Sequence, residues 1–170
     1  MMSFPFVIRA ETPSDAAAID SLLDVAFGPG RFAKTAYRLR EGVPHDPELS
    51  FVAFAGDGLV GSVRLTGIRI GESPALLLGP LAVAPHFANR GAGRELVRTA
   101  LATARAQGHR LVLLVGDLPY YGPLGFAPVP PGRVEMPGPV DPARLLACAL
   151  VPGALAEAHG AARRVAPAVT

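Results

Sequence analysis

The amino-acid sequence predicts a mixed α/β fold, in which helices flank a central β-sheet. Three observations carry this prediction: a β-hairpin at residues 50–70, an amphipathic helix that follows a glycine turn near residue 91, and a continuous aliphatic strand at residues 111–115. Half of the 170 residues are hydrophobic and 18% are charged, which is typical of a compact chain with a buried core. We therefore expect one domain that spans residues 1–170.

The amino-terminal third of the chain predicts a strand and one or two helices. Residues 6–9 form a short apolar run, and the segment 12–15 then offers cap-type residues and an early proline, which favour a helix start. Apolar residues recur at three- and four-residue steps over positions 16–26, until Gly28-Pro29-Gly30 ends the pattern. A second helix is predicted over residues 32–40, and a loop over residues 42–47.

Two β runs, at residues 50–55 and 59–70, are separated by the turn Gly56-Asp57-Gly58 and predict a hairpin. The next apolar run covers residues 75–84 and contains Gly79-Pro80. A proline lacks the N–H that a strand donates to its neighbour, so this run is expected to be irregular, at a sheet edge or at a bulge.

The middle of the chain predicts the order strand, glycine turn, helix, strand. After the turn, an apolar stripe occupies one side of a helix that ends near Gly108; its residues are Leu96, Val97, Ala100, Leu101 and Ala104. The aliphatic strand at residues 111–115 suits the middle of a sheet that is covered on both faces. Prolines and glycines break the pattern after residue 126, except for one further strand expected at residues 144–150.

The turn Arg90-Gly91-Ala92-Gly93-Arg94 is a candidate phosphate cradle. The first N–H groups of a helix have no partner within the helix, and the helix dipole adds partial positive charge there. Glycines let a ligand approach the backbone, and the two arginines can pair with phosphate oxygens. Taken alone, such a turn also fits an ordinary connection between a strand and a helix.

Two other nucleotide-binding motifs do not fit this turn. The dinucleotide fingerprint needs a third glycine at position 96, where the sequence has leucine. The phosphate loop of nucleotide hydrolases needs Gly-Lys-Ser/Thr, and the only lysine is Lys34.

Several function classes are disfavoured by composition. A single cysteine, Cys148, lies in an apolar segment, and the four histidines are scattered, so we expect no metal site. Aromatic residues make up only 6% of the chain and tryptophan is absent, which disfavours nucleic-acid binding. No apolar run is long enough to span a membrane and no signal-peptide pattern occurs, so we expect a cytoplasmic protein.

Three motifs in this order resemble the GNAT acetyltransferase superfamily, and the resemblance covers nearly the whole chain. They are Leu78-Gly79-Pro80-Leu81-Ala82-Val83-Ala84-Pro85, Arg90-Gly91-Ala92-Gly93, and Gly116-Asp117 through Tyr120-Tyr121-Gly122-Pro123-Leu124-Gly125-Phe126.

The resemblance implies a mixed sheet of about six to seven strands that holds acetyl-CoA where two parallel strands splay apart. The pyrophosphate would lie on the backbone of residues 90–94, and the pantetheine arm would run beside Leu81, Ala82 and Val83. The family motif has glutamine or arginine two residues before Arg90, whereas this chain has Ala88, so one side-chain contact is missing.

The resemblance also implies roles for two residues of the third motif. Tyr121 matches the position of a general-acid tyrosine that protonates the departing thiolate, with Tyr120 as the alternative. Many family members carry a basic carboxylate near the position of Gly79-Pro80, and this chain lacks it. Asp117 is then the candidate base, although an aspartate there also fits a simple helix cap; Glu41, Glu72 and His86 are weaker candidates.

The expected function is the transfer of an acetyl or short acyl group from CoA to a primary amine, on a small molecule or a peptide. The alternative is an acyl-CoA-binding module without catalysis, which the missing carboxylate motivates. We expect residues 27–47 and 132–142 to choose the acceptor, and the apolar carboxy-terminal part is compatible with a homodimer.

Overall fold

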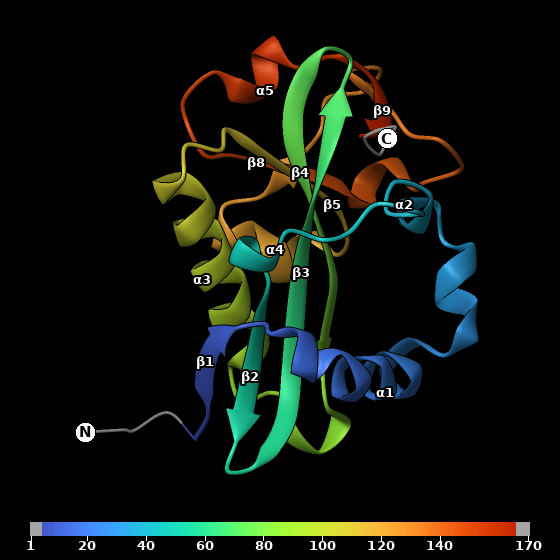
Figure 1. Ribbon diagram of the computed structural model, residues 1–170. Coiled ribbons are helices and arrows are strands. Elements are labelled where there is room, and N and C mark those ends of the chain that lie inside the picture. Colours follow the sequence, from blue (N-terminus) through green and yellow to red (C-terminus); the bar gives the residue numbers. More distant parts are fainter. Residues whose placement is uncertain (1–4, 166–170) are drawn as a thin grey trace, which may run out of the picture.

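A computed structural model describes residues 5–165 of the chain, without the side chain of Phe32 (Figure 1). Nine strands form one mixed sheet with the order β1-β2-β3-β4-β5-β8-β6, and β9 adds to β3 and pairs with β7. The strands are β1 (Val7–Ala10), β2 (Phe51–Ala55), β3 (Gly58–Ile70), β4 (Ser73–Val83), β5 (Leu111–Val115), β6 (Ala127–Pro128), β7 (Val134–Glu135), β8 (Leu145–Ala149) and β9 (Gly160–Arg164). The predicted α/β fold with a central mixed sheet is confirmed.

Helices lie on both sides of the long β3–β4 pair: α3 on one side, α1 and α2 on the other (Figure 1). The helices are α1 (Ala16–Phe27), α2 (Thr35–Arg38), α3 (Ala92–Ala106), α4 (Leu118–Tyr121) and α5 (Ala154–Glu157). None of the helices within residues 5–165 has the length and apolar character that a bilayer crossing requires. That residues 1–170 form one domain stays a prediction, and residues 1–4 and 166–170 lie outside the description.

The helix expected at residues 32–40 is wrong. A 3₁₀ turn, η2 (Pro29–Ala33), and the single-turn helix α2 replace it, with an extended Lys34 between them (φ −68°, ψ 143°). Extended backbone cannot continue the hydrogen-bond ladder of a helix, so the segment breaks there. The Lys34 ammonium group lies 4.6 Å from the centre of the Phe27 ring, which holds this break against the end of α1.

The α3 helix packs its predicted stripe against the sheet. Leu96, Val97 and Ala100 are fully buried, and α3 contacts β3 and β2. The Cδ1 atom of Leu96 lies 2.9 Å from where a Cβ at Gly61 of β3 would be. The absence of a side chain at Gly61 therefore lets the helix approach the sheet closely.

The β5 strand is buried on both faces, as its continuous aliphatic run predicts. It pairs with β4 on one side and with β8 on the other. Val112 and Leu114 join the core cluster that contains α3, whereas Leu111 and Leu113 join a second cluster with Ile68 and residues further along the chain.

The Gly79-Pro80 irregularity lies where β4 has a partner on one side only. β4 lies between β3 and β5 in the sheet order, but its pairing with β5 ends at Leu77, so this stretch is a local edge on the β5 side. The bulge alternative is confirmed, because the register shifts between Val63, which pairs with Leu81, and Leu65, which pairs with Leu78. β4 carries one residue more than β3 over this stretch, which is how a bulge bends a strand.

We expect Leu96→Ala to lower the free energy of unfolding by about 2–5 kcal/mol, because it leaves a cavity between α3 and the sheet. Urea denaturation followed by circular dichroism measures the change. The control is Val25→Ala on α1, where the side chain is 68% exposed and the expected change is within about 0.5 kcal/mol. Equal effects of the two substitutions would contradict this packing.

Candidate active site

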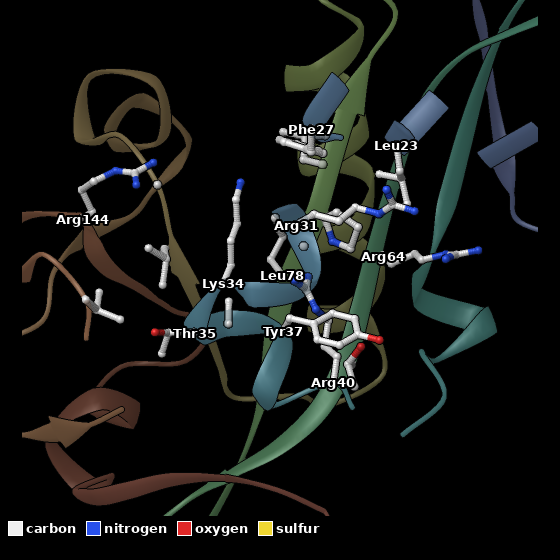
Figure 2. Close-up of a pocket in the computed structure, with 18 of the residues that line it drawn as sticks. Leu23, Phe27, Arg31, Lys34, Thr35, Tyr37, Arg40, Arg64, Leu78 and Arg144 are labelled. Carbon is white, nitrogen blue, oxygen red and sulfur yellow. The ribbon is translucent and has the colours of Figure 1, made fainter. Parts of the chain in front are cut away.

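The parallel strands β4 and β5 pair over only two residues. Leu76 and Leu77 lie opposite Val112 and Leu113, and the pairing then stops, although β4 continues to Val83 and β5 to Val115. A cavity of about 1230 Å³ opens at this divergence (Figure 2). Its walls come from α1, the segment of η2 and α2, β3, β4, the end of β5, α4, and the loop before β8.

The β4 wall of the cavity is formed by residues 78–81 and contains the bulge. Gly79 has φ +140°, a conformation that residues with a side chain rarely adopt. The Nη1 atom of Arg40 lies 2.9 Å from where a Cβ at position 79 would be. The guanidinium group thus takes up space beside the strand. Many members of the GNAT superfamily, which the sequence resembles, carry a carboxylate near this position.

The start of α3 has the unpaired N–H groups that the glycine turn predicts. The first hydrogen bond of the helix runs from the Glu95 N–H to the Gly91 carbonyl. Within residues 5–165, the N–H groups of residues 90–94 donate to no backbone or side-chain acceptor. Gly91 is the N-cap, and its φ of +88° is in the left-handed region that glycine favours. These donors are available to an anion.

The two arginines of the turn pack on aromatic rings. The Arg90 guanidinium carbon lies 5.1 Å from the centre of the Phe87 ring, and that of Arg94 lies 5.9 Å from the Tyr120 ring. Both arginine residues are exposed and neither forms an ion pair within the described residues. Their charged groups therefore flank the free N–H groups without being neutralised.

Tyr120 connects the start of α3 to the cavity. It belongs to α4 and lines the cavity, and a Cβ at Gly93 would overlap its hydroxyl group. The same Cβ would lie 3.4 Å from Val83 at the end of β4. Burial raises the pKa of Tyr120, and the nearby Arg94 partly opposes this rise. The phenol therefore stays protonated at neutral pH, beside the start of α3.

Tyr121 lines the cavity from the next position of α4. Its ring lies against the backbone of Gly116, where a Cβ would come within 2.5 Å of Cε2. It also packs edge-on against Tyr120 and Phe126, with ring centres 4.9 and 5.7 Å apart. Burial is the main cause that raises its pKa strongly, and Tyr120 and Asp117 add to the rise. Tyr121 is therefore a protonated phenol in a fixed position.

Asp117 lies at the cavity but is engaged at the surface. Its Oδ1 atom accepts a hydrogen bond of 3.1 Å from Arg144 Nε, and its side chain is 73% exposed. An exposed ion pair of this kind is worth little, so Arg144 does not lock the carboxylate. The three weaker base candidates, Glu41, Glu72 and His86, are absent from the described cavity wall.

The residues predicted to contact the pantetheine arm are the last three residues of β4. Leu81 lines the cavity, Ala82 is buried and pairs with Ser62 of β3, and Val83 is half-buried near Gly93. They connect the cavity with the start of α3, along the stretch of β4 that has no pairing to β5.

The two segments expected to choose the acceptor lie together at the cavity. Thr35 Oγ1 donates a 2.7 Å hydrogen bond to the Pro139 carbonyl, and Arg38 Nη1 donates one of the same length to the Pro137 carbonyl. Ten residues of the segment 27–47, between Phe27 and His45, and residues 139–141 of the segment 132–142 are in the cavity wall. These hydrogen bonds thus join two segments that are more than ninety residues apart in sequence.

Sequence reasoning missed a buried charge cluster behind the β3 wall. Glu11 accepts bonds from Arg64 Nε (2.9 Å) and His45 Nε2 (2.9 Å), and Arg64 and His45 line the cavity. Burial alone would raise the pKa of Glu11, but the hydrogen bonds from His45 and Arg64 outweigh it and lower that pKa to about 2. These residues are far apart in sequence and belong to no short motif, so only the folded arrangement shows the cluster.

No group of three or more histidine, cysteine or acidic residues in the described part of the chain is arranged to hold a metal ion. Cys148 is buried in β8, and burial raises the pKa of its thiol. An apolar, buried thiol of raised pKa is inert, so the thiol is not the nucleophile.

The unpaired N–H groups at the start of α3 thus lie beside a divergence of parallel strands in a mixed sheet. The model of the acetyltransferase (GNAT) family matches residues 16–126, and the chain belongs to this family. It is 33% identical to the uncharacterized N-acetyltransferase YjhQ of Escherichia coli K12 over 127 residues, which cover 72% of this chain and 70% of YjhQ.

A second relative is known from both sequence and structure. The uncharacterized N-acetyltransferase YhbS of Escherichia coli K12 is 32% identical over 123 residues, 71% of this chain and 72% of YhbS. A crystal structure of Escherichia coli YhbS in complex with CoA superposes with a TM-score of 0.82 at 25% identity, covering 97% of this chain and 92% of that one. An acetyltransferase of Brucella melitensis in complex with acetyl-CoA gives a TM-score of 0.59 at 28% identity, covering 85% of this chain and 96% of that one.

We expect Glu11→Gln to flatten the acid side of the stability profile. The folded-state pKa of Glu11, about 2, is below its ordinary value of 4.5, so its stabilisation is complete above about pH 4.5 and is lost as pH falls toward 2. Urea titrations at several pH values from 2 to 7 measure this. Wild type should lose more stability than Glu11→Gln between pH 4.5 and 2, and parallel profiles would contradict the assignment.

Proposed function

We propose that the protein transfers an acetyl or similarly short acyl group from CoA to a primary amine. The observation that carries the proposal is the run of unpaired N–H groups at residues 90–94, connected through Tyr120 to the cavity at the β4–β5 divergence. The presence of CoA in the structure of the relative YhbS supports it.

The cofactor site has two parts in this proposal. The N–H groups and the exposed charges of Arg90 and Arg94 take the diphosphate. Leu81, Ala82 and Val83 flank the pantetheine arm, whose amides pair with the part of the β4 backbone that β5 leaves free. The acyl group then enters the cavity where β4 and β5 diverge.

The chemistry is a direct attack on the thioester. A neutral amine forms a C–N bond to the thioester carbonyl carbon, the tetrahedral oxyanion collapses, and the C–S bond breaks. Tyr121 gives its proton to the departing thiolate, which its protonated and buried phenol allows. Asp117 takes the proton that the attacking amine loses, directly or through water.

Incubation of the purified protein with acetyl-CoA and a panel of primary amines, followed by detection of free thiol, tests the proposal. We expect thiol release that depends on both the protein and the amine, and an acetylated amine in the mass spectrum. The alternative module, which the absence of a carboxylate at Gly79-Pro80 favours, predicts that calorimetry detects CoA binding while no amine releases thiol.

Tyr121→Phe should lower kcat roughly 10²- to 10⁴-fold and leave the affinity for CoA unchanged, because only the proton donor is removed. Steady-state thiol release gives kcat, and calorimetry gives the CoA dissociation constant. Tyr120→Phe provides the comparison, since its hydroxyl meets Gly93 beside the cradle. It should act mainly on CoA affinity. A larger fall in kcat for Tyr120→Phe than for Tyr121→Phe would transfer the acid role to Tyr120.

Other expectations stay predictions. They concern a cytoplasmic location, a homodimer, the absence of metal, and the absence of nucleic-acid and membrane partners.

A further inference from the structure

Arg40 stands out among the arginines that line the cavity. Arg31 pairs with Asp24, Arg64 pairs with Glu11, and Arg144 pairs with Asp117; the three ion pairs are complete within the molecule. Arg40 has no ion pair and no side-chain hydrogen bond among residues 5–165. It is therefore a cavity arginine whose charge the described part of the protein leaves unmatched.

The position of Arg40 is close to where the proposed reaction takes place. Arg40 follows the buried Leu39 just after α2, and its Nη1 atom lies 2.9 Å from the Cβ position of Gly79 on β4. Gly79 itself belongs to the cavity wall at the divergence of β4 and β5. In Figure 2, Arg40 and Tyr37 come from the segment of α2, and Leu78 comes from β4.

Burial makes this unmatched charge costly. Loss of contact with water lowers the pKa of Arg40 to about 10, with Arg64 adding repulsion and Tyr37 opposing the shift. The side chain nevertheless keeps its charge near pH 7, because that pKa remains well above neutrality. A charge taken partly out of water is stabilised by an anion that reaches it.

The guanidinium group is suited to a carboxylate. Its planar donors match the two oxygens of a carboxylate in a bidentate pair, which is stronger than a pair of neutral groups. Lys34, which lines the same cavity, adds a second cation without a carboxylate partner in the described residues. The acidic wall residues Asp20 and Asp141 have no ion pair among the described residues, but both are exposed, whereas Arg40 is half-buried.

From this geometry we infer that the acceptor is a primary amine that carries a carboxylate, and that Arg40 binds this carboxylate beside Gly79. The amine end of such an acceptor then points along the β4 wall toward the divergence, where the thioester lies in the proposed function. This inference rests on that function and names its substrate class. Arg40 acts here as a residue that determines specificity.

The test compares amines that differ only in the carboxylate. The twenty standard L-amino acids, β-alanine and γ-aminobutyrate are assayed with acetyl-CoA, each beside its primary amide. We expect at least one carboxylate-bearing acceptor to exceed its amide roughly 100-fold in kcat/KM, the loss that follows when a charged hydrogen-bonding partner is removed. Amides that equal or exceed their acids throughout the panel would overturn the inference.

Variants assign the preference to Arg40. Arg40→Gln should raise KM for the carboxylate acceptor by roughly 100-fold, leave KM for acetyl-CoA unchanged, and leave the amide reaction unchanged. Arg40→Lys keeps the charge but loses the bidentate fork, so its KM for the carboxylate acceptor should fall between those of wild type and Arg40→Gln. The matched control is Arg110→Gln, which removes an exposed arginine paired with Glu157 outside the cavity wall. An equal loss for acid and amide in Arg40→Gln would show a structural role and overturn the inference.

A binding measurement separates this inference from the proposed function. The same acids and amides are titrated into the CoA-saturated protein by calorimetry, with wild type, Arg40→Gln and Arg110→Gln. Carboxylate binding that Arg40→Gln abolishes, without any acyl transfer, supports the carboxylate site and contradicts only the transfer chemistry. If acid and amide bind equally, or neither binds, the carboxylate site is overturned whatever the activity.

Discussion

The rest of the site depends on the early end of pairing between β4 and β5. Parallel strands that pair along their length would bury the backbone groups of both, and no ligand could lie between them. Here the pairing stops at Leu77 and Leu113, although both strands continue. The bulge at Gly79-Pro80 provides the cause, since a bulge bends its strand and a proline has no N–H to donate. The cavity, the free stretch of β4 and its approach to α3 follow from this divergence.

Gly79 and Arg40 fit one another in the folded chain. The φ of Gly79 would strain a residue with a side chain, so the position favours glycine. The missing side chain leaves the space that the Arg40 guanidinium approaches. Where many family members carry a carboxylate, this protein therefore has a cation from a different segment.

Regular elements could be predicted from the sequence because their side-chain periods are set by the layers they face. The stripe of α3 and the double-sided burial of β5 are examples, and the glycine turn before α3 indicated its unpaired N–H groups. The Gly79-Pro80 pair indicated an edge or a bulge, but not that β4 has a neighbour whose pairing stops at Leu77, because pairing partners depend on topology. Arg40 and the cluster of Glu11, His45 and Arg64 gave no signal at all, since their roles arise from contacts between distant segments.

The adjacent tyrosines show how one helical turn joins the two halves of the site. Successive residues of a helix point about 100° apart, so neighbours on α4 face different surroundings. Tyr120 points to the start of α3, where its hydroxyl meets Gly93, whereas Tyr121 packs on Gly116 and Phe126 at the end of β5. A ligand that runs from the free N–H groups to the cavity therefore passes one phenol before it meets the other. The short α4 helix, which no periodicity could reveal, fixes this order and gives two chemically identical side chains different surroundings.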